Sequence, residues 1–348
     1  MSTSRIALLA ALSAAFASTA AAQDFPRFSA DFLAEVETDG VVSASDPDAE
    51  ITDTYLTFTA AFGLEYAEGS GLFAALVFEP VKDATDDRFF EDHGLYVDSL
   101  YLRHDFGPLA ALAGKFAPAF GQAWDAAPGL YGADFAGDYE LLEKLGASIE
   151  VPFVAAGGEH AFLASIYTAD DTELSRSVIT SRGKTRRSDG GPSNSDDPSF
   201  ALSLQGSFGD IGYNAGFLRQ AKGDGDDRAE TGGVAGLTYA MPLADGVLSL
   251  IGEGAYLHGY GGERVNAFVG TAGAAYSFQD WTFSAVYANR SFSDSRDNDH
   301  LATVGVDYQL TEAVGLSLAY RYGEEDGGDS HTVGAYVSFA FGVSAPLR

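Results

Sequence analysis

The stretch RFSADFLAEVE, residues 27–37, alternates apolar and polar side chains at all but one position. Because successive side chains of an extended chain point to opposite faces, this alternation predicts a β-strand with one apolar and one polar face. The same pattern recurs along nearly the whole chain. It predicts sixteen strands in total, at 27–37, 53–65, 71–81, 94–105, 109–118, 145–154, 159–167, 199–208, 211–219, 231–241, 247–257, 265–278, 281–290, 300–310, 314–322 and 331–341.

The segments between these strands alternate in length. Short ones, such as Gly209-Asp210 and Gln279-Asp280, carry residues suited to tight reversals. Eight longer polar ones fall between them, at 39–52, 82–93, 119–144, 168–198, 220–230, 258–264, 291–299 and 323–330. An even number of antiparallel strands with short turns at one rim and long loops at the other predicts an all-β transmembrane barrel. In lipid, a sheet satisfies all its backbone amides only by closing on itself.

The two faces of the strands fit this architecture. The segment VGLSLAYRY, residues 314–322, has valine, leucine and tyrosine on one face and glycine, serine, alanine and arginine on the other. We expect the first face to meet lipid, and water rather than packed side chains to fill the small and polar interior. Aromatic residues near both rims indicate interfacial girdles, although strand propensity alone also enriches them. They are Phe208, Tyr239, Phe278, Trp281 and Tyr308 near the short turns, and Tyr256, Tyr287, Tyr320 and Tyr322 near the long loops.

The ends and the bulk composition set the class of protein. Residues 1–22 have a single arginine, an apolar run and small residues at the end, which indicates a secretory signal peptide. Residues 23–348 show no linker, so we expect one barrel domain. The formal charge of −30 argues against a nucleic-acid partner. A hydrophobic content of 46% argues against disorder.

Local motifs make the chain resemble the porins of Gram-negative outer membranes, in particular the general-diffusion porins of the alphaproteobacterial type. Gly114-Lys115-Phe116 leads through Phe120-Gly121 into the third long loop, and the last strand ends in Phe341 like the closing strand of that family. The resemblance implies a homotrimer in the outer membrane, surrounded by lipid and lipopolysaccharide, that passes small hydrophilic solutes. It also implies that the third loop, 119–144, folds into the barrel and narrows the pore.

The resemblance is incomplete at the C-terminus. In that family the final aromatic residue commonly ends the chain, whereas here Gly342 to Arg348 follow it. Either the last strand runs further than its pattern indicates, or the tail is tolerated.

A water-filled pore selects by its width and by the charge at its narrowest point. We expect the narrowing to be formed by loop acids and by Lys115 on the wall just before the loop. Glu140 and Glu143 have an equal alternative, since the stretch DYELLEKLG could form a short helix in which Glu140 pairs with Lys144. The loop acids are Asp125, Asp134, Asp138, Glu140 and Glu143.

Charged residues are also expected along the lumen wall. Alternation places Arg290 and Arg321 inside, near the outer rim. Arg103 is ambiguous, because the phase that places it inside sends Asp98 toward lipid, unless a bulge intervenes. Inward acids outnumber inward bases, which predicts weak cation selectivity. These acids are Asp31, Glu35, Glu150, Glu253 and Asp307.

Other functions find less support. A channel specific for a sugar, phosphate or an iron chelate is the main alternative. The chain lacks the GxSxG, HExxH, Walker and GxGxxG motifs, so neither an enzyme nor a cofactor is expected, although a hydrolase site around His300 or His331 is an alternative. The acidic loops lack the EF-hand spacing, so no metal site is expected. The basic fourth loop, with Arg182 and Arg187, would either bind lipopolysaccharide phosphates or be a solvated loop.

Overall fold

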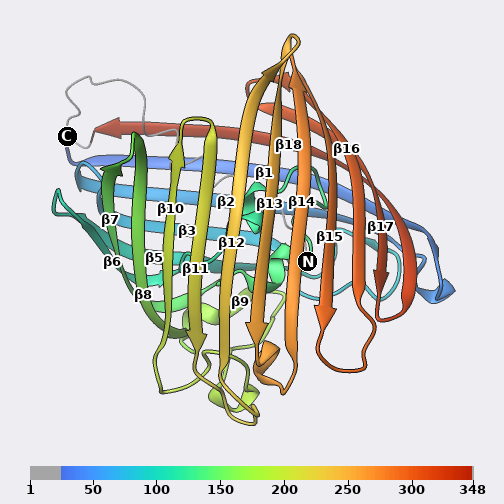
Figure 1. The fold of residues 1–348 in the computed structure, drawn as a ribbon, viewed down its shortest axis with the longest axis horizontal. Coiled ribbons are helices and arrows are strands. Elements are labelled where there is room, and N and C mark those ends of the chain that lie inside the picture. The colour runs from blue at the N-terminus through green and yellow to red at the C-terminus, as the bar shows by residue number, and fades with distance from the viewer. Residues whose placement is uncertain (1–24, 347–348) are drawn as a thin grey trace.

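The computed structural model describes residues 25–346, whose long strands pair antiparallel in one sheet that closes on itself (Figure 1). β1 pairs with β2 on one side and with β18 on the other, so the wall has no free edge. The predicted sixteen-stranded barrel is confirmed. Its strands are β1 (Arg27–Ala44), β2 (Thr52–Ala67), β3 (Ser70–Pro80), β5 (His93–Asp105), β6 (Ala110–Phe116), β7 (Lys144–Ala155), β8 (Gly158–Ala169), β10 (Ser199–Phe208), β11 (Ile211–Gln220), β12 (Glu230–Leu243), β13 (Gly246–His258), β14 (Asn266–Phe278), β15 (Trp281–Phe292), β16 (Asp299–Thr311), β17 (Val314–Glu325) and β18 (Gly328–Pro346).

The loops contain short elements. Two are strands, β4 (Arg88–Phe89), which pairs with β2, and β9 (Ser177–Ile179), which pairs with β5. The helical turns are η1 (Pro47–Ala49), α2 (Ala123–Ala126), η2 (Ala136–Tyr139), η3 (Glu173–Ser175), η4 (Arg187–Asp189) and η5 (Tyr260–Gly262). Within the described residues, no helix is long and apolar enough to span a bilayer.

The prediction of an eighth long loop at 323–330 is wrong. β17 and β18 extend into it and leave a turn of only Asp326 and Gly327, both with positive φ, at 51° and 77°. Two consecutive residues of this kind form the tight hairpin turn whose twist matches that of the flanking strands. The other seven expected loops join strands at the same rim, and strand pairing trims several of them.

The closing strand runs past Phe341. β18 continues to Pro346, which pairs with Arg27 at the start of β1. Phe341 lies opposite Phe32 in this pairing, and their rings stack with centroids 4.9 Å apart. The stretch 342–346 is therefore part of the barrel wall.

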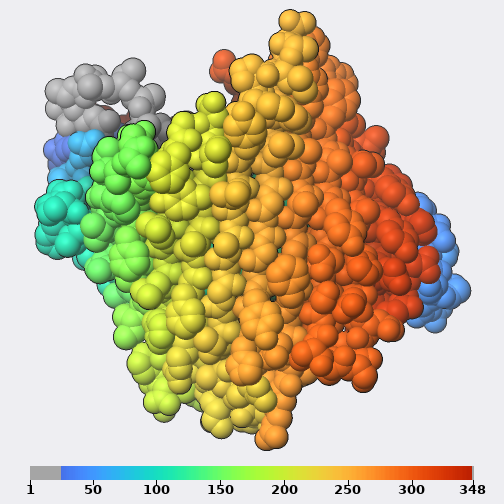
Figure 2. All heavy atoms as spheres, in the orientation of Figure 1, coloured from blue at the N-terminus to red at the C-terminus, as the bar shows by residue number. Residues whose placement is uncertain are grey.

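The outer surface of the barrel is apolar and aromatic. Figure 2 shows the continuous wall built by β10 to β17. The aromatic residues expected at the rims include six that are strongly exposed: Phe208, Tyr239, Tyr256, Trp281, Tyr287 and Tyr320. At the external rim, Tyr287 and Tyr320 also bond His300 and His331 on the neighbouring strands. Amphipathic rings at these positions suit the boundary between hydrocarbon and headgroups.

The interior differs from the expectation of a polar, water-filled lumen. Residues 117–143, here called loop 3, lie inside the barrel (Figure 1). Apolar side chains of loop 3, among them Phe120 and Phe135, pack against inward residues of β8 and of β10 to β16, such as Leu218 and Leu257. Packed side chains therefore fill part of the interior, because burial of this apolar surface stabilises the inward fold of the loop.

The wall is completed by the fourth loop where loop 3 leaves it. β6 pairs with β5 only as far as Lys115, which lies opposite Leu100. Beyond that point β5 pairs with β9 instead, with Ser177 opposite Tyr96 and Ile179 opposite Gly94. The backbone groups that the departure of loop 3 would leave open on β5 are thus paired by a segment from the fourth loop.

Candidate functional site

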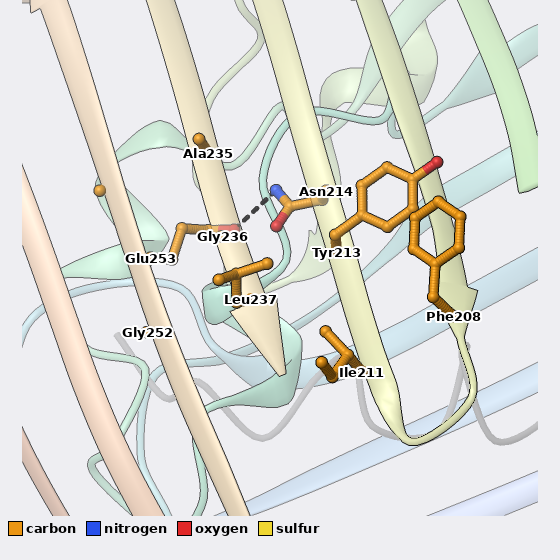
Figure 3. Close-up of a pocket in the computed structure, with 10 residues that line it drawn as sticks. Phe208, Ile211, Tyr213, Asn214, Ala235, Gly236, Leu237, Gly252 and Glu253 are labelled. Atoms are coloured by element: carbon orange, nitrogen blue, oxygen red, sulfur yellow. Dashed lines mark hydrogen bonds between the residues drawn. The ribbon is translucent and has the colours of Figure 1, made fainter. Parts of the chain in front are cut away.

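The carboxylate of Glu253 on β13 anchors loop 3 to the wall through several hydrogen bonds. Its oxygens accept hydrogen bonds from the backbone N–H of Gln122 at 2.9 Å and of Ala123 at 2.8 Å. They also accept one from the Tyr139 hydroxyl at 2.6 Å and one from the Asn214 side chain at 2.7 Å. Figure 3 shows Asn214 on β11 directed toward Glu253 across β12. Glu253 is therefore the buried anchor of loop 3 and is not an open acid of the wall.

The close approach of the loop to Glu253 depends on Gly121. Its φ is +73°, and a Cβ there would lie 2.6 Å from the Tyr139 ring and 3.0 Å from Oε1 of Glu253. Only glycine adopts this backbone conformation without strain and leaves that space. The Phe120-Gly121 pair that marked the loop in the sequence is the point where loop 3 turns onto its anchor.

Two of the predicted acids of loop 3 form ion pairs with two of the predicted arginines of the wall. Asp138 forms an ion pair with Arg290 of β15, and Arg321 of β17 donates from Nε to Asp134 at 2.9 Å. Each arginine has a second acidic partner, since Arg290 contacts Asp299 at 2.7 Å and Arg321 contacts Glu325 at 2.5 Å. These contacts hold loop 3 against the wall and neutralise much of the charge of both groups.

The tip of loop 3 reaches β1. The Tyr131 hydroxyl donates a hydrogen bond to Oδ1 of Asp39, and the Tyr55 hydroxyl of β2 donates to Oδ2 at 3.2 Å. Gly334 on β18 makes room, because a Cβ there would lie 1.8 Å from the Tyr131 oxygen. Loop 3 therefore contacts the wall from β13 round to β1.

The remaining predicted loop acids have different settings. Asp125 lies in α2, where burial raises the pKa of its carboxyl to about 6. Burial also raises the pKa of Asp138, against the opposing effect of the Arg290 guanidinium. Glu140 is half-buried directly after η2. The helix expected through Glu140 and Lys144 does not form, because η2 ends at Tyr139 and Lys144 begins β7.

Lys115 does not face open lumen as expected. Its side chain is 0% exposed, and its ammonium lies 2.7 Å from Glu143 and 2.9 Å from Asp170. Although burial acts in the opposite direction, hydrogen bonds from Thr172 and Lys115 lower the pKa of Asp170, so this carboxylate remains charged. Lys115 and Glu143 thus join the base of loop 3 to the fourth loop.

Sequence reasoning missed the role of Arg182. The sequence places this residue among the bases of the fourth loop, yet its guanidinium contacts both oxygens of Glu143, at 2.9 and 2.6 Å. It also lies 3.8 Å from the ring centre of Tyr96 on β5. The fourth loop returns to the sheet through β9 just before this residue, and that long-range pairing gives no local signal in the sequence.

The ambiguity of Arg103 is resolved by a β-bulge. Ala75 pairs with Ser99 and Leu76 with Val97, so Asp98 is the extra residue that resets the alternation. Arg103 lies on the inner side, where it contacts Glu150 at 3.2 Å. A neutralised pair therefore occupies this part of the wall.

The Lys115 cluster gives a first prediction. Replacing Lys115 with methionine keeps an unbranched side chain one atom shorter but leaves Asp170 buried without its cation. We expect a loss of about 3–5 kcal/mol in local stability, typical of a buried ion pair that loses one partner. In SDS gels of the purified protein heated in steps, the band of the folded barrel should disappear at a lower temperature for this variant than for the unmodified protein.

The matched control for this prediction is Arg264→Met. Its pair with Asp227 is exposed, at 73% and 53% of the two side chains, so about 0–1 kcal/mol is expected. Equal thermal behaviour of the Lys115 and Arg264 variants would contradict the assigned role.

Acids on the inner face of β1 complete the site. Asp31, Glu35, Glu37 and Asp39, here called the β1 acid column, share the face on which Asp39 meets Tyr131 of loop 3. Within residues 25–346, no arginine, lysine or histidine forms an ion pair with Asp31, Glu35 or Asp39. Asp31, Glu35 and Asp39 of this column therefore differ from Asp134 and Asp138, which are paired with arginines.

Among the residues that the structure describes, no three His, Asp or Glu side chains are arranged to hold a metal ion.

Comparisons with known proteins agree with this architecture. The family described as Gram-negative porin matches residues 7–328. No curated protein matches the chain.

Several solved structures share the fold. The outer membrane channel DcaP of Acinetobacter baumannii is similar with a TM-score of 0.59 and 12% identity, over 90% of this chain and 97% of that one. Pseudomonas putida OprB has a TM-score of 0.60 and 10% identity, over 90% and 94% of the chains. A mutant of the Rh. blastica porin has a TM-score of 0.55 and 16% identity, over 90% and 100%.

The family match spans most of the chain, and the closed barrel with an inward third loop is the architecture that the porin resemblance implied. The expected location in the outer membrane is also confirmed. The chain belongs to the Gram-negative porins and is an outer-membrane channel protein.

Proposed function

We propose that the chain passes small hydrophilic solutes and ions by passive diffusion and prefers cations. Asp31, Glu35 and Asp39 of the β1 acid column carry this proposal, because no base forms an ion pair with them within residues 25–346. The acids of loop 3 do not, because Asp134 and Asp138 are paired with arginines. Charge that no neighbouring base compensates sets the sign of the potential in a narrow, low-dielectric pore.

The alternatives fit the contacts less well. A pore for phosphate or anionic chelates needs available guanidinium groups, whereas Arg290 and Arg321 each contact two carboxylates. A hydrolytic site around His300 or His331 is not favoured, because Nδ1 of each ring is hydrogen-bonded to a tyrosine hydroxyl. Tyr287 lies 2.9 Å from His300, and Tyr320 lies 2.6 Å from His331. The proposal therefore includes no catalytic step.

The proposal also includes assembly as a homotrimer among outer-membrane lipid and lipopolysaccharide. Membership of the porin family supports the oligomer. The exposed tyrosines at the external rim support contact with headgroups.

Ion selectivity tests the proposal directly. In a planar bilayer under a KCl gradient, we expect stable ohmic channels whose reversal potential has the sign of cation preference. Changing the column to Asp31→Asn, Glu35→Gln, Glu37→Gln and Asp39→Asn should move that potential toward zero, because it removes the acidic groups from this part of the wall.

A control variant removes the same number of charges outside the lumen. Asp210→Asn, Asp245→Asn, Asp280→Asn and Glu312→Gln change four exposed acids in the short turns and should leave the potential nearly unchanged. Anion preference in the unmodified protein would refute the proposal, and current that saturates with one solute would favour a specific channel.

A further inference from the structure

Four polar side chains come together at the external ends of neighbouring strands. Lys144 begins β7, Gln220 ends β11 and Glu230 begins β12, while Tyr167 lies near the end of β8. β8 pairs with β7 on one side and with β10 on the other, and β10 pairs with β11, so these strands lie side by side (Figure 1). We call Lys144, Tyr167, Gln220 and Glu230 the Glu230 cluster.

Glu230 is the centre of this cluster. Its Oε1 accepts a hydrogen bond from Nε2 of Gln220 at 2.8 Å, and its Oε2 accepts one from the backbone N–H of Gly261 at 2.9 Å. Lys144 and Tyr167 both lie close enough to Glu230 to interact with it electrostatically. The four side chains therefore face one another across the strands that carry them.

The cluster lies on the external side of loop 3. The ring of Tyr167 packs in the apolar cluster that loop 3 forms with the wall. Tyr260, which precedes Gly261, donates a hydrogen bond to Asp138 of loop 3 at 3.3 Å. A solute that enters from outside therefore meets the Glu230 cluster before it passes loop 3.

Lys144 differs from the other bases of the inner wall. Each of those forms an ion pair with a carboxylate; they are Arg103, Lys115, Arg290 and Arg321. Lys144 forms no ion pair or hydrogen bond within residues 25–346, and its side chain is only half-buried. Its ammonium group is therefore available to an acceptor that enters from the mouth.

Two buried polar atoms of the cluster also lack partners within the described residues. The Tyr167 side chain is 2% exposed, and its hydroxyl has no hydrogen-bond partner there. Gln220 is 7% exposed, and its amide nitrogen is directed to Glu230, so its Oε1 points elsewhere and meets no donor. Buried polar atoms rarely lack partners, so these two atoms indicate that a hydrogen-bonding group binds beside them.

The available groups define two different ends of a ligand. The Lys144 ammonium and the Tyr167 hydroxyl donate hydrogen bonds, which fits a carboxylate. Oε1 of Gln220 accepts, and the carboxylate of Glu230 lies beside it, which fits an ammonium group. A simple anion would leave Gln220 without a donor, and a simple amine would leave Lys144 without an acceptor. A zwitterion satisfies both ends.

We propose that the Glu230 cluster binds the zwitterion of a free α-amino acid at the outer mouth of the pore. The carboxylate of the amino acid accepts hydrogen bonds from Lys144 and Tyr167. Its ammonium group donates to Oε1 of Gln220, next to Glu230. This inference rests on the proposed function, because it names one class of small hydrophilic solute that enters the channel.

Titration of the detergent-solubilised protein with L-alanine, followed by saturation-transfer NMR of the alanine methyl group, tests the inference. We expect saturable binding. Propionate lacks the ammonium group and ethylamine lacks the carboxylate, so both should bind far more weakly. Lys144→Met should weaken L-alanine binding at least about tenfold, the effect of losing one hydrogen bond to a charged group. Tyr167→Phe removes only the hydroxyl and should weaken binding less.

Lys222→Met is the matched control. It removes the same charge two residues beyond Gln220, but Lys222 is exposed in the loop after β11 and lies outside the cluster. Equal weakening by the two lysine variants would mean that only the general potential of the mouth acts, which would overturn the inference. Propionate binding as tight as that of L-alanine would overturn it as well. If Lys144→Met does not fold, unchanged binding by Tyr167→Phe overturns the inference, and weakened binding supports it.

Failure of the inference is separable from failure of the proposed function. A cation-selective channel without saturable L-alanine binding leaves the function standing and removes the site. A protein that does not conduct, yet binds L-alanine in a way that Lys144→Met weakens and Lys222→Met does not, refutes the function and keeps the site.

Discussion

Deletion of residues 128–140 is expected to raise the single-channel conductance severalfold while the barrel remains folded. The deleted segment contains the tip of loop 3 and its contacts with Arg290, Arg321 and Asp39. Arg290 keeps Asp299 and Arg321 keeps Glu325, so neither arginine is left without a carboxylate. The wall keeps all its backbone pairing, because no strand contributes to the deletion.

The measurement is a histogram of conductance steps in a planar bilayer, together with the exclusion limit for neutral polymers. Both should increase, since the loop that occupies part of the lumen is removed. A control deletion in an external loop, such as residues 293–297 of the seventh loop, should change neither. Unchanged conductance after deletion of 128–140 would show that loop 3 is not the barrier to flow.

Glu253→Gln is expected to loosen the part of loop 3 that contacts β13, while its ion pairs with Arg290 and Arg321 remain, and to produce a larger, noisy conductance. The substitution keeps the shape of the side chain but replaces one acceptor oxygen with an amide that cannot accept. The donors from Gln122, Ala123 and Tyr139 then compete for one neutral oxygen. Hydrogen bonds to a charged group contribute about 1.5–3 kcal/mol each. Their weakening in the variant should allow this part of loop 3 to rearrange.

Bilayer recordings at constant voltage, with limited proteolysis of the detergent-solubilised protein, would measure this loosening. We expect flickering between open levels and new cleavage within residues 120–140. Glu150→Gln is the matched control, because Glu150 also lies on the inner wall but is 40% exposed and forms an ion pair with Arg103. If both variants behave like the unmodified protein, Glu253 does not anchor the loop.

Much of the barrel is readable from alternation alone. The segments 199–208 and 331–341 alternate because one face meets lipid, and this local requirement places the strands within a few residues of β10 and β18. The predicted strand ends are wrong where a strand continues beyond its alternating segment because a neighbouring strand pairs with it. Polar residues 323–325 and 328–330 become strand because each has a neighbour across the hairpin, and residues 342–346 because β1 is beside them.

The candidate site is less predictable for a similar reason. Alternation places Arg290, Arg321 and Glu253 inside correctly, but it carries no information on what each side chain meets there. Glu253 bonds a segment more than a hundred residues earlier in the chain. Arg182 reaches Glu143 only because the fourth loop returns to the wall through β9.

The sequence by itself determines that this protein is a closed barrel with an acidic interior and an irregular third loop. Strand alternation and turn preferences depend on residues that are close together in the chain, so they can be recognised in the sequence alone. Only the tertiary structure decides that the loop acids Asp134 and Asp138 are paired with arginines, that Lys115 is buried, and that the tip of loop 3 meets Asp39 of the β1 acid column. Ion pairing and desolvation depend on which distant groups the closed barrel brings within a few ångströms, and that distance is set only when the sheet closes.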